Sequence, residues 1–102
     1  MIGEKTGYER EEWRGAEVPA PEEWSVNWVE GDVISWYWGD EKTPDGTYAH
    51  LFAKYDGGFD PVAHELQFDD DTVEVDHDEN YSIVMSRVAK ALADHAPTED
   101  NA

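Results

Sequence analysis

Short runs of alternating apolar and polar residues constrain the fold of this chain more than any other feature of its sequence. Residues 62–68, VAHELQF, alternate between Val, His, Leu and Phe on one side and Ala, Glu and Gln on the other. Residues 72–77, TVEVDH, alternate in the same way after three consecutive aspartates. Because successive side chains of a strand point to opposite faces, this period of two predicts two half-buried strands joined by a turn.

Two aromatic segments predict further strands. Residues 24–38, WSVNWVEGDVISWYW, carry Gly31 and Asp32 at their centre. A glycine there supplies the positive φ that a type II′ turn requires, so we favour a hairpin. A short helix over residues 21–30 is the alternative, because Pro21 followed by two glutamates suits a helix start. Residues 47–55, TYAHLFAKY, form another strand candidate.

The last element has the period of a helix. From Tyr81 onward, apolar residues recur at spacings of three and four and form one stripe; they are Val84, Met85, Val88, Ala91 and Leu92. Asp78, Glu79 and Asn80 supply acid and a candidate cap at its N-terminus, and Pro97 ends the helical pattern. We expect the stripe to be buried, with Arg87 and Lys90 exposed. The fold class is therefore α+β: an antiparallel β-meander of four to five strands with one C-terminal helix packed on a face.

The domain organisation follows from the same pattern. Residues 1–23 are rich in Glu, Gly and Pro, and we interpret them as an irregular acidic N-terminal arm, with Tyr8, Trp13 and Val18 as its anchors. Residues 24–96 form the α+β domain, and residues 97–102 are expected to be a frayed tail. A sheet with one helix leaves part of its second face uncovered, so we expect a homodimer or another protein partner.

The charge is the strongest compositional signal. Twenty-five acidic and seven basic residues give a net charge of −18, and the acids are spread along the whole chain. This pattern is typical of proteins from cells that accumulate molar salt, where screening lengths shrink to about 3 Å. Mimicry of a nucleic acid and cation binding by acidic loops are the alternatives. Without a basic n-region or a long apolar run, we expect a cytoplasmic protein with no membrane segment.

Several classes of chemistry lack their motifs. The chain has no cysteine, which excludes disulfides and thiolate sites. It contains neither a phosphate-binding glycine loop nor a serine in a GxSxG elbow. Asp69–Asp71 lack the Gly and terminal Glu of a calcium loop, and no Lys/Arg cluster could bind a nucleic-acid backbone. We therefore name no catalytic residue and no obligatory cofactor.

The tryptophans are the first candidate site. Trp36 and Trp38 lie on one side of their strand, and Trp24 and Trp28 could share a side of the neighbouring strand. Paired aromatic rings on a sheet can stack a ligand or contact a partner. The alternative interpretation is that these rings fill the core, because a small two-layer domain needs bulky apolar residues.

The histidines are the second candidate site. A one-residue slip would turn a strand over, so the hairpin around Asp69–Asp71 must place its apolar residues on one face. The predicted register pairs three residues of one strand with three of the other: Phe68 with Val73, Leu66 with Val75, and His64 with His77.

The same reasoning on the preceding hairpin adds a third imidazole. Pairing Ile34 with Phe52 sets Trp36 opposite His50, which would then lie on the same face as the histidine pair. His64, His77 and His50 beside carboxylates would suit Zn²⁺ or a similar ion. The alternative is that these rings merely close the rim of the core.

Together these observations favour a non-enzymatic interaction or accessory domain of a salt-adapted proteome, which self-associates through its sheet or helix. A metal-binding protein or small enzyme using the histidine cluster is one alternative. A small-ligand module using the Trp platform is the other.

Overall fold

A computed structural model describes residues 11–97 of the 102-residue chain. Its elements, in chain order, are β2 (Glu12–Trp13), β3 (Ala16–Glu17), β4 (Trp24–Glu30), β5 (Val33–Trp38), β6 (Tyr48–Lys54), β7 (Ala63–Gln67), β8 (Thr72–Asp76) and α1 (Tyr81–Asp94). The strands β4 to β8 form one antiparallel sheet in sequential order, and β2 and β3 form a separate two-stranded sheet. Among residues 11–97, no helix is long and apolar enough to cross a lipid bilayer.

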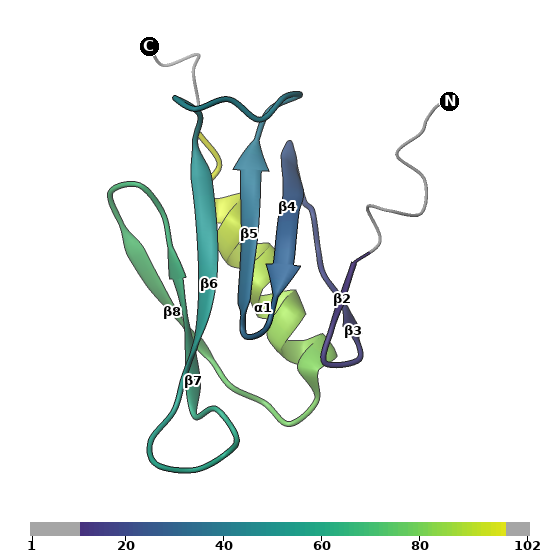
Figure 1. Ribbon diagram of the computed structural model, residues 1–102, viewed down its shortest axis with the longest axis vertical. Coiled ribbons are helices and arrows are strands. Elements are labelled where there is room, and N and C mark those ends of the chain that lie inside the picture. The colour runs from purple at the N-terminus through teal and green to yellow at the C-terminus, as the bar shows by residue number, and fades with distance from the viewer. Residues whose placement is uncertain (1–10, 98–102) are drawn as a thin grey trace.

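The five-stranded meander and the single C-terminal helix form two layers. In Figure 1, α1 lies behind the sheet and the β2–β3 hairpin lies beside β4. The α+β meander predicted from the sequence is therefore confirmed, with five strands in the sheet. The other face of the sheet is not covered by the helix.

The turn at Gly31 explains why residues 24–38 form a hairpin. Gly31 has a φ of +59°, whereas Asp32 keeps a negative φ, as in a type II′ turn. The alternative of a helix over residues 21–30 is wrong, because Trp24–Glu30 is a strand.

The helix meets the expectations from its pattern. Val84, Val88 and Leu92 are all 0 % exposed, whereas Arg87 and Lys90 are exposed. The side chain of Asn80 caps the first turn by accepting a hydrogen bond from the Ser82 amide at 3.0 Å. The helix ends at Asp94, three residues before Pro97.

The arm that precedes the sheet is partly ordered. Residues 12–17 form the β2–β3 hairpin rather than an irregular segment, because Arg14 and Gly15 both adopt positive φ and make a two-residue turn. Trp13 and Val18 are buried, as expected of anchors, whereas Tyr8 lies outside the described residues. Two indoles fasten the arm: Trp13 Nε1 donates to the Gly31 carbonyl, and Trp36 Nε1 donates to the Pro19 carbonyl.

The strand registers differ from the predicted ones in two places. Between β5 and β6, Ile34 lies opposite Leu51 instead of Phe52, a slip of one residue. Between β7 and β8, Leu66 lies opposite Val73 instead of Val75, a slip of two. A slip of one residue turns side chains to the other face, whereas a slip of two keeps them on the same face. The consequences for the two candidate sites are therefore different.

Candidate functional site

The tryptophans do not form one platform. Trp24 and Trp36 are 2 % and 0 % exposed and lie in the core between sheet and helix. The Trp24 indole donates to the Leu92 carbonyl at 2.9 Å, and Trp38 packs edge-on against the Trp24 ring. Stacking of a ligand on Trp24 or Trp36 would require the core to open, whereas Trp38 is half-buried.

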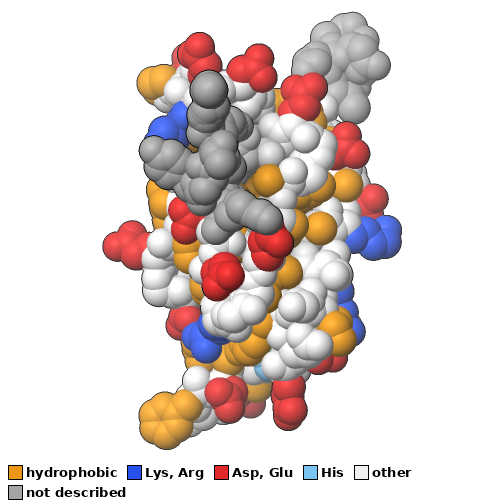
Figure 2. All heavy atoms as spheres, turned by 90° about the vertical axis from the view of Figure 1, so that its right-hand side faces the viewer, with side chains coloured by type: hydrophobic (Ala, Val, Ile, Leu, Met, Phe, Trp, Pro, Cys, Tyr) orange, Lys and Arg blue, Asp and Glu red, His pale blue; other side chains and the backbone are white. Residues whose placement is uncertain are grey.

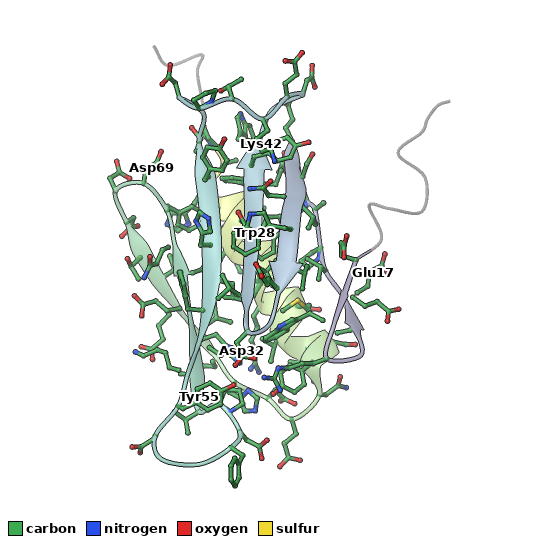
Figure 3. All side chains as sticks on the ribbon, viewed as in Figure 1. Glu17, Trp28, Asp32, Lys42, Tyr55 and Asp69 are labelled. Atoms are coloured by element: carbon green, nitrogen blue, oxygen red, sulfur yellow. The ribbon has the colours of Figure 1, made fainter. Side chains whose placement is uncertain are left out.

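Trp28 lies on the opposite face because β4 contains a bulge. Val26 pairs with Trp36, but Trp28 pairs with Ser35, so Asn27 is an extra residue. The bulge reverses the alternation of side chains, and the prediction that Trp24 and Trp28 share a side is wrong. Figure 3 shows Trp28 in front of the sheet, on the side away from α1.

Trp28 belongs to an aromatic surface on the uncovered face, which we call the open face. The register places side chains of β4, β5 and β6 here, and the rings are those of Trp28, Tyr37, Tyr48, His50 and Phe52. Trp28 is 39 % exposed and the other rings are half-buried. The His50 ring lies 5.9 Å from that of Trp28, 6.5 Å from that of Tyr48 and 6.4 Å from that of Phe52, between centroids.

A chain of hydrogen bonds runs beneath these rings. Lys42 Nζ donates to Asn27 Oδ1 at 3.0 Å, and Asn27 Nδ2 donates to Ser35 Oγ at 3.1 Å. Ser35 Oγ lies 3.1 Å from His50 Nε2. Burial lowers the pKa of His50 and favours its neutral ring, whose Nε2 atom pairs with the Ser35 hydroxyl.

The Ser35–His50 contact resembles the hydrogen bond between a nucleophile and its base. Ser35 is 0 % exposed, however, so a substrate has no access to its hydroxyl. We assign the chain of hydrogen bonds a positioning role, in which it holds the bulged strand and the His50 ring in one arrangement.

His50 is therefore separated from the other two predicted metal ligands. It lies opposite Ser35 on the open face, whereas the prediction placed it opposite Trp36. His64 and His77 do come together on the helix side, with His64 Nε2 3.0 Å from His77 Nδ1. They are diagonal neighbours, because His64 lies opposite Val75.

One imidazole of the histidine pair is closed off in the core, and the other, that of His77, is half-buried. His64 is 0 % exposed, and the rings of Trp13 and Tyr81 pack against it edge-on. Within residues 11–97, no group of three His, Cys, Asp or Glu side chains is placed to hold a metal ion. Two imidazoles supply fewer protein ligands than the three or four of zinc sites. The pair is therefore described best as a partly buried hydrogen bond.

A polar cluster near this pair was missed in the sequence. Arg14 forms an ion pair with Asp32, and the Tyr55 hydroxyl donates to the other Asp32 oxygen at 2.6 Å. The hydrogen bonds from Tyr55 and Arg14 lower the pKa of Asp32. The cluster joins the β2–β3 turn, the β4–β5 turn and the end of β6, and Figure 3 shows Asp32 and Tyr55 at the same end of the molecule.

Comparison with models of known protein families finds no match, and comparisons with curated proteins and with solved structures find none either.

Proposed function

We propose that this chain is a non-enzymatic interaction domain that self-associates through the open face of its sheet. The observation that carries the proposal is the aromatic surface around Trp28, which α1 leaves uncovered. Aromatic residues are enriched at the centres of protein interfaces, where they supply much of the binding energy.

The rigidity of this surface supports a binding role. Hydrogen bonds already hold four side chains in place before any partner binds: those of Lys42, Asn27, Ser35 and His50. Less entropy is then lost when the partner docks. A second copy of the chain is the partner we favour, because a two-fold contact would cover two identical aromatic surfaces at once.

The acidic surface belongs to the same proposal. Figure 2 shows acidic side chains scattered over one side of the molecule with few basic ones between them, instead of gathered in one patch. Such a distribution supports adaptation to a salt-rich cytoplasm more than mimicry of a nucleic acid. In molar salt, the repulsion between two copies with a charge of −18 each is screened, and the aromatic contact decides association.

Sedimentation equilibrium in about 3 M KCl tests this proposal, because screening is then strong. The wild-type chain should sediment as a dimer and Trp28→Glu as a monomer, since the new carboxylate would be buried in the contact. Ile83→Glu is the matched control, because Ile83 on α1 is also 39 % exposed. A monomeric wild type, or the same mass for both variants, would contradict self-association through the open face.

A further inference from the structure

The strand β4 ends the sheet, and one of its two edges is hydrogen-bonded to no strand among residues 11–97, although the β2–β3 hairpin lies on that side of β4 (Figure 1). The Gly39 amide donates to the Glu23 carbonyl at 3.0 Å, across the gap between β4 and β5. Alternate residues of an antiparallel strand turn their backbone groups to opposite edges. The amide and carbonyl of Ser25 therefore face β5, and those of Val26 face away from the sheet.

A groove runs along this free edge. Its volume is about 750 Å³, within the range of sites that bind ligands. Four consecutive residues of β4, 24–27, line it together with residues of the preceding arm, and residues 37, 39 and 40 at the end of β5 complete the lining. Because side chains alternate between faces, a wall made of consecutive residues exposes the backbone edge of the strand. The groove is thus open to an extended chain that could pair with Val26.

The charges along the groove select its occupant. Four carboxylates line it, those of Glu11, Glu22, Glu23 and Asp40, and no lysine or arginine is among its described lining residues. A second copy that added its own β4 edge would bring the same carboxylates into contact inside the groove, where partly buried charges are screened less than those on the exposed surface. A strand that carries basic side chains would neutralise them instead.

We propose that the free edge of β4 accepts, as an added strand, an extended segment of a partner protein that is rich in lysine and arginine. The main-chain hydrogen bonds to Val26 give the segment its direction, and the four carboxylates give the preference for basic residues. The Trp24 amide on this edge already donates to the Pro21 carbonyl at 3.0 Å. The bulge between Val26 and Trp28 interrupts the edge on the other side, so the added strand pairs with Val26 alone. The groove shares Asn27 and Tyr37 with the border of the open face, but the pairing with Val26 does not depend on self-association.

A labelled peptide of alternating lysine and valine, about eight residues long, is a suitable probe for the full chain in molar KCl. Fluorescence anisotropy should show binding, and the Val26 amide should become protected from hydrogen exchange. Only one edge of an added strand faces β4. N-methylation of one alternate set of peptide amides should therefore weaken binding about tenfold, and methylation of the other set should leave it unchanged.

Charge variants of the protein test whether the groove carboxylates favour a basic segment. The double variant Glu22→Gln and Glu23→Gln should weaken binding at least about threefold. The control, Glu74→Gln with Glu79→Gln, removes the same charge from exposed positions outside the groove and should bind as the wild type does. The proposal is overturned if the peptide does not bind, if both methylated peptides bind equally, or if a glutamate–valine peptide binds as tightly. Perturbation of the Trp28 indole without protection of Val26 would also overturn it.

Discussion

At the scale of single residues, the buried imidazole of His64 carries a defined protonation state. Its Nδ1 atom has no hydrogen-bond partner within residues 11–97, and its Nε2 atom contacts His77. A buried N–H without an acceptor costs more than a bare ring nitrogen. We therefore infer that the proton sits on Nε2 and is donated to His77 Nδ1.

This arrangement predicts loss of stability in mild acid. Burial, then the His77 and Arg14 charges, lower the pKa of His64 from 6.5 to about 4, with Asp32 opposing. As the pH decreases, the His64 imidazole is therefore protonated in the unfolded chain at a higher pH than in the folded protein. The contribution of the neutral His64 ring to the free energy of unfolding is fully present above about pH 6.5. It falls by about 3 kcal/mol as the pH decreases to about 4. Urea unfolding at several pH values and constant KCl measures this slope.

The variant His64→Gln provides the control for this prediction. Glutamine retains an N–H donor for His77 but does not titrate, so its unfolding free energy should change less between pH 6.5 and 4. Equal slopes in the variant and the wild type would show that another group causes the acid sensitivity.

At the scale of elements, α1 is held to the sheet by its apolar stripe. Val88 is 0 % exposed, so Val88→Asp would place an unpaired charge in the core and should cost about 3–5 kcal/mol. Ser86→Asp introduces the same charge on the exposed side and should cost less than about 1 kcal/mol. Chemical denaturation of the two variants measures the difference.

A milder substitution covers the case in which Val88→Asp does not fold. Val88→Ala removes two buried methyl groups and should cost about 2 kcal/mol. If Val88→Ala and Ser86→Asp both have wild-type stability, then α1 does not contribute to the core through this stripe.

At the scale of the whole molecule, the net charge of −18 should make folding depend on salt. The screening length falls from about 10 Å at 0.1 M salt to about 3 Å at 1 M. We expect the thermal midpoint to rise by at least about 10 °C between 0.1 and 3 M KCl, since about 2 kcal/mol of relieved repulsion suffices in a domain of this size. A midpoint that stays flat would require a partner to explain the acidic surface.

The local sequence pattern was sufficient for the five strands of the main sheet, for the helix and for the fold class. The type II′ turn at Gly31, the strands and the apolar stripe of α1 follow from backbone geometry and from the periods of two and 3.6 residues. The contact between His64 and His77 was also predicted, although the register was wrong by two residues. A slip of two keeps both rings on the core face.

The β2–β3 hairpin had a local signal that was overlooked. A glycine follows Arg14 between the apolar residues Trp13 and Ala16, as a two-residue turn with positive φ requires. The strands have two residues each, too few for a visible alternation, so only the turn could have revealed them.

The sequence by itself determined which segments form the main sheet, which segment is the helix, and which side of the helix is buried. Only the tertiary structure decided which strand faces meet. The bulge at Asn27 moves Trp28 to the open face, and a one-residue slip between β5 and β6 moves His50 there as well. Registers and bulges depend on how side chains from distant segments pack together, and the local sequence pattern does not predict that packing.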